Sequence, residues 1–542
     1  MINFGELTVR DRVSVLVVGA GLAGLAGAAF LAGRGVDVLL VERRSGTSPF
    51  PRAVGQNQRT MELLGFAGIA EDVPALAPGQ GGGFRVRVAG SLPGPTFHEE
   101  VTDADTSDVG VLSPAAPGTA GQDVLEPILR RHAETLGAEL LFDTELVSFE
   151  QDEHGVTAQV RGRDGRTHRV RADYLVAADG HRSGVRDALG VERHGPGGLG
   201  HNVSIIFDAD LGALSSPDRP TLHVIHGEQV KGVFITIDHA AGRHLLSVAY
   251  EPSTGQSPAD FTTERCAELI RLVTEMPELR PEIQAVQPWE MAGAVADRFR
   301  VGRVLLAGDA AKVTPPSGGF GGNTAVGDAY DLAWKLAAVL DGTAGPALLD
   351  TYDAERRPIA ERVVAEALRL VAARTPGADA PEPGAEQVSD QQRAAELTLG
   401  FRYCSSSVLT DDDPADTGTE DPYRPSGRPG FRAPHVWLHR DGEKLSSVDL
   451  FGRGFVLLAG PDGGRWRSAA DEIAARLGLI LHGHQIGADL ADPDDAFLSR
   501  YGIGPAGASL IRPDGVVAWR ATDMPDDPAR TLHAVLTAIL AR

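Results

Sequence analysis

The chain has 542 residues, and its 51 Lys and Arg against 74 Asp and Glu give a formal net charge of −23. This acidic surplus disfavours partners that attract Lys and Arg, so we expect no binding to nucleic acid or to anionic membranes. No signal-like segment opens the chain, no run reaches the about 18 apolar residues of a membrane-spanning helix, and Cys266 and Cys404 are the only cysteines. We therefore expect a large, soluble, cytoplasmic protein without a disulfide framework or a metal site.

The first chemical signal is a glycine-rich turn after a buried strand. Val13–Val18 is a continuous apolar, β-branched run, as expected of a parallel strand buried on both faces. Gly19, Gly21 and Gly24 follow it and lead into a predicted helix over Leu22–Arg34. The first glycine permits the tight turn, the second lets a pyrophosphate approach, and the third lets the helix pack closely on the strand. The spacing predicts a dinucleotide-binding turn, with the helix N-terminus facing the phosphates.

An acidic residue closes the same unit. A second predicted strand, Val36–Val41, ends in Glu42, whose carboxylate can accept hydrogen bonds from ribose hydroxyls and would repel a 2′-phosphate. FAD or NAD is therefore favoured over NADP at this turn. Turn residues and a short helical pattern follow over Pro51–Leu64. Four polar side chains lie close enough in sequence to reach a phosphate or an isoalloxazine, although each alone is equally explained as a surface residue: Arg43, Arg44, Arg52 and Gln56.

Two later segments have a related form, in which an apolar strand ends in an aspartate and a glycine. Tyr174–Ala178 delivers Asp179 and Gly180, in the sequence DGHRSGVR, to the carboxyl end of a strand, where open α/β sheets bind ligands. In RVLLAGDAAKVTPPSGGFGGN another strand ends in Gly308 and Asp309. Both aspartates also have a plain structural interpretation as caps of the helices that follow them.

A packed helix is predicted over Thr324–Leu340, directly after the glycine-rich loop of residues 315–323. The start of a helix presents unpaired N–H groups and a partial positive charge of about half a unit. Negative charge placed at this point is therefore stabilised, and the loop has the conformational freedom that movement of a ligand would need.

The chain changes character outside these segments. Residues 190–290 contain short β-rich segments separated by turn signals, which predict a mostly antiparallel sheet inserted into the nucleotide unit. A long helix is predicted over Leu348–Ala373, and Pro-, Gly- and acid-rich stretches in residues 375–432 predict a linker with a helical connection. Residues 433–542 alternate strands and helices in the order of thioredoxin, but the absence of Cys-x-x-Cys excludes dithiol chemistry and favours a structural or oligomerisation role.

In this order and at these separations, the segments around Gly19, Asp179 and Asp309 resemble the FAD-binding set of class A FAD-dependent aromatic hydroxylases, the p-hydroxybenzoate hydroxylase class. The stretches PRAVGQNQRTMELL, GDAAKVTPPSGGFGGNTAVGDAYDLAWKLAAVL and SGRPGFRAPHV are most similar to the aklavinone hydroxylases and related aromatic polyketide hydroxylases. The resemblance implies an α/β fold with a Rossmann-like FAD domain (residues 1–189 and 291–374), an inserted substrate-binding antiparallel β-sheet (190–290), a connection (375–432) and a cysteine-free thioredoxin-like domain (433–542).

The resemblance also implies a reaction. FAD is reduced by NADPH or NADH, O2 adds at flavin C4a, and the resulting hydroperoxide hydroxylates a polycyclic aromatic polyketide of the anthracycline or angucycline type in bacterial antibiotic biosynthesis. Two alternatives remain open because a fold does not fix a reaction. One is another flavin monooxygenase, such as an epoxidase, a Baeyer–Villiger enzyme or an N-oxidase; the other is a non-catalytic flavoprotein that sequesters a pathway intermediate. Either a monomer or a homodimer is compatible with the sequence.

Residue roles follow from the same resemblance. It implies that Asp309 binds the ribityl hydroxyls and that the helix start after the glycine loop favours the negative charge of reduced flavin near N1 and the C2 carbonyl. Asp179, Gly180 and Arg182 are implied in contacts to FAD and NADPH. The remaining cofactor candidates belong to the third segment: Gly308, Pro316, Gly319, Gly321, Gly322 and Asn323.

The substrate side carries weaker signals. His223 and His226 alternate with apolar neighbours on one predicted strand, and Arg374 occupies a position where related enzymes carry a substrate-side arginine. A cation there would lower the pKa of a phenol, so Arg374 is also the one candidate catalytic residue. Each of these three residues has an ordinary structural interpretation as well.

Overall fold

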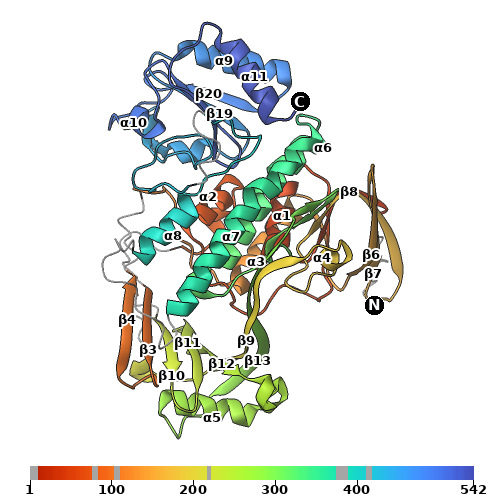
Figure 1. Cartoon of the computed structure of the whole chain (residues 1–542), viewed down its shortest axis with the longest axis vertical. Coiled ribbons are helices and arrows are strands. Elements are labelled where there is room, and N and C mark those ends of the chain that lie inside the picture. Colours follow the sequence, from red (N-terminus) through yellow and green to blue (C-terminus); the bar gives the residue numbers. More distant parts are fainter. Residues whose placement is uncertain (1–9, 76–83, 103–109, 216–220, 374–388, 411–417) are drawn as a thin grey trace, which may run out of the picture.

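The computed structural model describes residues 10–75, 84–102, 110–215, 221–373, 389–410 and 418–542. These ranges form a central α/β unit, an inserted sheet on one side of it, and a C-terminal unit on the other (Figure 1). No helix within the described ranges combines the length and the apolar character that crossing a membrane would require.

The central sheet is mostly parallel and has the strand order β14–β15–β8–β1–β2–β5, with a hairpin of β6 and β7 extending from β8. Val41, Val18, Ala177 and Leu306 lie in one row across β2, β1, β8 and β15. The residues that follow these four strands therefore meet at one edge of the sheet. The strands span Arg12–Val18 (β1), Val38–Val41 (β2), Glu139–Leu141 (β5), Glu145–Asp152 (β6), Gly155–Arg161 (β7), Thr167–Ala177 (β8), Arg300–Val301 (β14) and Val304–Leu306 (β15).

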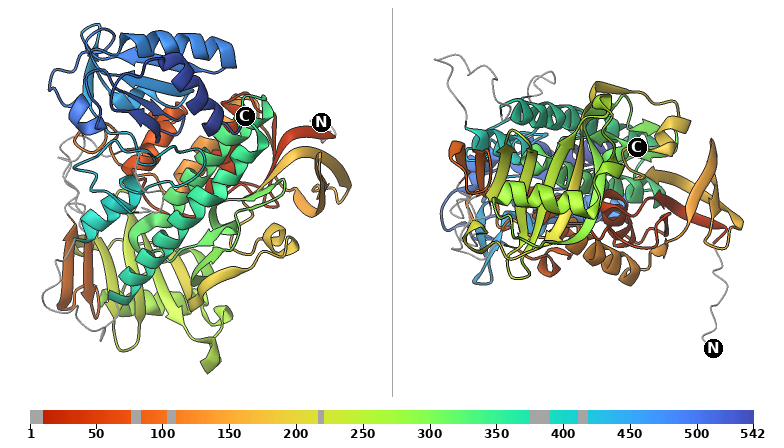
Figure 2. Two further views of the ribbon diagram at one scale, coloured as in Figure 1. Left: turned by 45° about the horizontal axis from the view of Figure 1, so that its top comes forward. Right: turned by 90° about the horizontal axis from the view of Figure 1, so that it is seen from below.

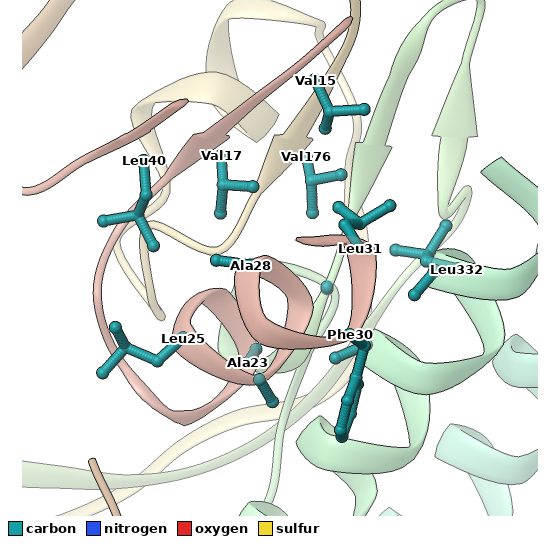
Figure 3. Packing of buried hydrophobic residues seen from close by; sticks show 14 of the residues in the cluster. Val15, Val17, Ala23, Leu25, Ala28, Phe30, Leu31, Leu40, Val176 and Leu332 are labelled. Carbon is teal, nitrogen blue, oxygen red and sulfur yellow. The ribbon is translucent and has the colours of Figure 1, made fainter. Parts of the chain in front are cut away.

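Helix α1 (Leu22–Ala32) is buried along its whole length against this sheet. Its apolar side chains, including Leu31, face Val17 and Val176 of the strands, and Leu332 of α6 (Phe320–Leu340) packs beside it (Figure 3). Small residues on α1 permit this close approach. The other helices of the unit are α2 (Gln58–Phe66), α3 (Gln122–Thr135), α4 (Gly184–Ala188) and α7 (Asp350–Ala373).

The inserted sheet has the order β16–β13–β9–β12–β11–β10–β3–β4, and every neighbouring pair is antiparallel except β10 and β3. Helix α5 (Thr263–Thr274) covers one face, as the view from below shows (Figure 2, right). The opposite face looks toward the central unit and the end of α7 (Figure 1). The strands span Phe84–Ala89 (β3), Thr96–Thr102 (β4), Arg193–Asp208 (β9), Thr221–His226 (β10), Lys231–Asp238 (β11), Arg243–Tyr250 (β12), Glu282–Ala296 (β13) and Lys312–Val313 (β16).

The C-terminal unit has a four-stranded sheet of order β20–β19–β21–β22, in which only β19 and β20 are parallel. Trp466 of α9 and Leu536 of α11 pack into its core. Its elements span Trp437–Arg440 (β17), Glu443–Ser446 (β18), Phe455–Ala459 (β19), Gly464–Leu477 (α9), Leu481–Gln485 (β20), Phe497–Tyr501 (α10), Ala508–Ile511 (β21), Val517–Ala521 (β22) and Pro528–Ile539 (α11); α8 (Asp390–Leu399) lies in the connection.

The predicted fold class is confirmed, and three details differ from the sequence-based expectation. Helix α6 begins at Phe320 and not at Thr324, so Gly321 and Gly322 lie in its first turn. Strands β3 and β4 join the inserted sheet although they precede it by more than 90 residues in the chain. Helix α5 lies within a region for which only strands were predicted.

Candidate functional site

The three glycines of the turn after β1 are not equivalent: packing requires two of them, and the third borders a space. Gly19 has φ +103°, and a Cβ built on it would lie 2.3 Å from the carbonyl oxygen of Ala178. A Cβ on Gly24 would lie 1.8 Å from the carbonyl oxygen of Gly19. On Gly21, in contrast, the nearest atom would be Oε1 of Glu126 at 3.9 Å. Packing therefore demands the first and third glycines, whereas the second leaves a space that the protein itself does not fill.

The N-terminus of α1 borders this space. Gly21 is its N-cap residue, and no side chain among the described residues caps the helix start. The N–H groups of the first turn and the partial positive charge of the helix end are therefore available to an anion, as the dinucleotide prediction requires.

Glu42 is held beside the same turn. Its Oε2 accepts the N–H of Ala20 at 2.8 Å, and its Oε1 accepts the N–H of Arg44 at 2.9 Å. An ionised carboxylate has about four acceptor positions, so these two bonds fix the group and leave capacity for ribose hydroxyls. The side chains of Arg43 and Arg44 are exposed.

Arg52 lies among charges of the candidate site, although its side chain is exposed. Partial burial lowers the pKa of Arg52, Arg44 lowers it further, and the charges of Asp309 and Glu126 oppose that shift. Sequence reasoning missed Glu126, which is 1% exposed and accepts hydrogen bonds from the Ser48 N–H at 2.7 Å and the Gln122 amide at 2.6 Å. An acidic residue on the buried face of α3 was the signal that could have identified it.

Gln56 has a different environment from the one predicted. Its amide nitrogen donates to the carbonyl of Ala120 at 2.8 Å, and its amide oxygen accepts the N–H of Ala120 at 3.2 Å. Both polar ends of the side chain are thus engaged by the backbone of Ala120. Gln56 nevertheless lines a small hollow together with Leu22, Gly322 and Asn323.

The second segment places one unsatisfied acceptor at the sheet edge. Asp179 accepts the N–H of Val185 through Oδ2 at 3.1 Å, which agrees with its structural interpretation as a cap. Its Oδ1 is buried and has no hydrogen-bond partner among the described residues. A buried acceptor without a partner is costly, so this oxygen fits a donor supplied by a ligand. Gly180 has φ +86°, and the side chain of Arg182 is exposed.

The third segment meets the first directly. Gly308 has φ +59°, and a Cβ on it would lie 2.8 Å from Cβ of Ala23 in α1. Asp309 is exposed at the sheet edge; the protein around its carboxyl removes enough water to raise its pKa, while Lys312 and His181 act in the opposite direction. The segment that carries the aspartate and the glycine turn therefore lie side by side at the same edge of the sheet.

Asn323 ties the start of α6 to the segment before α2. Its Oδ1 accepts the N–H of Asn57 at 2.9 Å and the hydroxyl of Thr60 at 2.7 Å, and its Nδ2 donates to the carbonyl of Gly319 at 2.9 Å. Gly319 is the N-cap of α6, with φ +65°, and no described side chain caps this helix. Pro316 lies exposed in the preceding loop. The N-terminus of α6 therefore resembles that of α1 in offering unpaired N–H groups.

The two predicted substrate-side histidines lie on opposite faces of the inserted sheet. His223 packs against Phe234 with ring centroids 5.8 Å apart, on the face that α5 covers, and burial lowers its pKa to about 4. His226 lies three residues further along β10 and so faces the central unit, and its Nε2 is buried without a partner among the described residues. The expectation that both face one substrate is therefore not met. Arg374 lies outside the described residues.

The site as a whole fits a dinucleotide that carries a flavin. It offers a space at Gly21 that a Cβ would fill, an acid beside it for ribose hydroxyls, an unpartnered oxygen on Asp179, and a second uncapped helix start for the negative charge of a reduced ring. Segments that lie up to about 290 residues apart in the chain supply these features. The sequence predicts that these same segments come together.

Comparison with known proteins assigns the family. A model of the FAD binding domain matches residues 12–367, and a model described as aromatic-ring hydroxylase, C-terminal, matches residues 426–542. Aklavinone 12-hydroxylase RdmE of Streptomyces purpurascens is 50% identical over 98% of this chain and 99% of its own length. The tetracenomycin A2 monooxygenase-dioxygenase of Streptomyces glaucescens is 44% identical over 98% of this chain and 97% of its own.

A solved structure shares the fold. The crystal structure of a ternary complex of aklavinone-11 hydroxylase with FAD and aklavinone matches with a TM-score of 0.90 and 49% identity, over 98% of this chain and 100% of that one. The family model of the FAD binding domain and the FAD in that complex agree with the cofactor expected for this site. The chain belongs to the FAD-dependent aromatic-ring hydroxylases.

Proposed function

We propose that this enzyme uses FAD, NADPH or NADH, and O2 to hydroxylate a polycyclic aromatic polyketide of the anthracycline or angucycline type. The observation that carries the proposal is near full-length similarity at 50% and 44% identity to enzymes named for aklavinone and tetracenomycin A2. The matching crystal structure, whose name includes both FAD and aklavinone, supports the same substrate class.

The residues of the cofactor site have separable roles. When bound, FAD supplies the redox chemistry and the activation of O2. Gly21 gives the pyrophosphate access to the N–H groups of α1, and Glu42 accepts hydrogen bonds from ribose hydroxyls. Asp309, and the free oxygen of Asp179, accept from hydroxyl or amide donors of the cofactor. The N-terminus of α6 favours negative charge by about 1 kcal/mol.

The face of the inserted sheet that looks toward the central unit is suited to fused rings. An apolar row runs across it through Ile206, Leu245, Ile235 and Leu222. The adjacent row contains Ser204 and Ser247, and Nε1 of Trp289 donates to Oγ of Ser204 at 2.9 Å. Apolar groups bury a ring system and a few polar groups orient it, which is the usual composition of a ligand site.

His226 extends this wall at the end of β10, where its unpartnered Nε2 matches a phenolic or carbonyl oxygen. We also propose Arg374 as a substrate-side cation. The proposed domain limits remain residues 1–189 and 291–374 for FAD, 190–290 for substrate, 375–432 for the connection and 433–542 for the C-terminal domain. The sheet additionally receives β3 and β4. A cytoplasmic monomer or homodimer completes the proposal.

The decisive experiment combines a spectrum with turnover. The purified protein is expected to be yellow with flavin absorption bands. A panel of anthracyclinone and angucyclinone phenols is then tested for substrate-stimulated FAD reduction, and products formed under isotopically labelled O2 are analysed by mass spectrometry. One labelled oxygen on an aromatic carbon is expected. An epoxide, an inserted ring oxygen or an N-oxide, or binding without NAD(P)H consumption, would refute the proposed hydroxylation.

A further inference from the structure

Arg512 joins the C-terminal unit to the central unit through a fully buried guanidinium. The residue lies in the turn between β21 and β22 and is 0% exposed. Its Nη1 and Nη2 donate to the two carboxylate oxygens of Glu355 in α7 at 2.6 and 2.9 Å. Its Nε and Nη2 donate to Asp514 at 3.1 and 2.5 Å. The planar guanidinium thus binds a carboxylate of another unit through two directed hydrogen bonds, a geometry that lysine cannot provide.

Glu355 extends the contact to α6, the helix whose N-terminus borders the cofactor site. Nζ of Lys335 lies 2.7 Å from both Glu355 Oε2 and Asp331 Oδ2, and all of these groups are buried. A buried ion network contributes little net stability, because desolvation offsets its attraction. In some proteins such buried polar groups instead specify how the elements that carry them are arranged.

A second buried cluster continues one turn earlier on α6 and ends at the cofactor strand. Asp328 accepts hydrogen bonds from Nζ of Lys312 at 2.5 Å, from Nε of Arg356 at 2.9 Å and from the N–H of Gly308 at 3.2 Å. Gly308 immediately precedes Asp309. The position of Asp328 therefore sets the backbone that presents the proposed ribityl-binding carboxylate.

Tyr403 connects the two clusters. Its hydroxyl accepts a hydrogen bond from Nη1 of Arg356 at 2.8 Å, and its ring lies 5.3 Å from the guanidinium carbon of Arg512. Nη2 of Arg356 also donates to the carbonyl of Thr324 near the start of α6, at 3.3 Å. A continuous set of buried contacts therefore runs from the C-terminal unit to the start of α6 and to the strand end at Gly308.

We infer that Arg512 is a positioning residue for the flavin site, through which the C-terminal domain holds α6 and the strand end at Gly308 in the arrangement that binds FAD. This gives the cysteine-free C-terminal domain a role in cofactor binding without any direct contact to the cofactor. The inference depends on FAD as the cofactor and not on the identity of the polyketide, so a failure of the substrate proposal leaves it intact.

The test compares two Arg→Lys substitutions that keep the charge and remove the fork. Arg512→Lys disturbs the network, whereas Arg432→Lys disturbs a different buried ion pair, in which Nε of Arg432, at the end of the connecting segment, donates to Glu62 of α2 at 2.9 Å. Both variants are expected to unfold at a lower temperature. Only Arg512→Lys is expected to raise the FAD dissociation constant, by about tenfold, to alter the visible circular dichroism of bound flavin and to lower its midpoint potential.

Equal FAD affinity, flavin spectrum and potential in Arg512→Lys and the wild type, with only a lower melting temperature, would overturn the inference. So would an equal loss of FAD affinity in Arg432→Lys. If Arg512→Lys does not fold, Tyr403→Phe decides the question, because it removes only the hydroxyl that joins Arg356 to the network. Weaker FAD binding with a changed flavin spectrum in Tyr403→Phe supports the inference, and wild-type values refute it.

Discussion

The pair Gly21→Ala and Gly24→Ala tests whether the glycine turn is a ligand site or only a turn. A methyl group on Gly24 would meet a backbone oxygen at 1.8 Å, so the turn must move, at a cost of about 2 kcal/mol or more to the free energy of unfolding. A methyl group on Gly21 meets nothing closer than 3.9 Å. At this N-cap, which has φ −81°, the poorer capping by alanine and its lower unfolded-state entropy nearly offset each other, so apo stability changes by less than about 1 kcal/mol.

The two variants should therefore differ in which property they lose: Gly24→Ala lowers the stability of the apoprotein, whereas Gly21→Ala lowers the affinity for FAD. The methyl group of Gly21→Ala occupies the space that a pyrophosphate needs in order to reach the N–H groups of α1. Loss of one charge-assisted hydrogen bond costs about 1.5–3 kcal/mol, or about ten- to a hundredfold in the dissociation constant. Thermal unfolding of the apoprotein and fluorescence titration with FAD measure the two quantities. Wild-type FAD affinity in a normally folded Gly21→Ala variant would refute the assignment.

Three further outcomes are expected. Glu42→Gln should weaken FAD binding about tenfold in the same titration, because an amide accepts fewer hydrogen bonds from ribose hydroxyls; an unchanged constant contradicts the ribose contact. Burial raises the pKa of Asp331 from 3.8 to about 7; the charge of Lys335 opposes this shift and that of Glu355 adds to it. The folded state thus keeps a proton that the unfolded state has lost, and stability should fall by up to about 1.4 kcal/mol per unit as pH rises from about 4 to 7. Melting temperatures of Asp331→Asn at several pH values should lack this fall, and parallel profiles for variant and wild type would count against it. His226→Leu should weaken substrate binding with little effect on FAD affinity, whereas His223→Leu, on the far face, should spare substrate affinity; the reverse pattern in a substrate titration would exclude His226 from the wall.

The parts of the fold that were predictable from sequence are those with local causes. The turn around Gly19 was found because strand, glycines, helix and acid are contiguous, and packing confirms the steric need for Gly19 and Gly24. The start of α6 was missed because glycine has low helix propensity, and here Asn323 compensates by tying the first turn to Asn57 and Thr60. Strands β3 and β4 were missed because β3 pairs with β10, far along the chain.

Buried charge was the least predictable feature. Asp331 and Lys335 stand four residues apart on α6 and resemble an ordinary surface pair, yet both are fully buried. Glu355 of α7 and Arg512 from a distant unit join them there and complete the buried set of charges. Glu126 is a further buried acid: its place on the buried face of α3 could have singled it out, but its partner, the N–H of Ser48, belongs to an irregular segment. No periodicity in the sequence announces such partners.

The order in which the ribosome releases this chain bears on when it can acquire its cofactor. Strands β9–β13 of the inserted sheet interrupt the central sheet between β8 and β14, so β15 and Gly308 emerge only after more than half of the protein has been synthesised. A nascent chain that ends before them has β1, β2 and β8 but lacks the strand end at Gly308, which forms one side of the cofactor site. Pairing between strands that lie far apart in the chain is also slow to form. Cofactor capture is accordingly a late event of biosynthesis, and truncated translation products would be colourless.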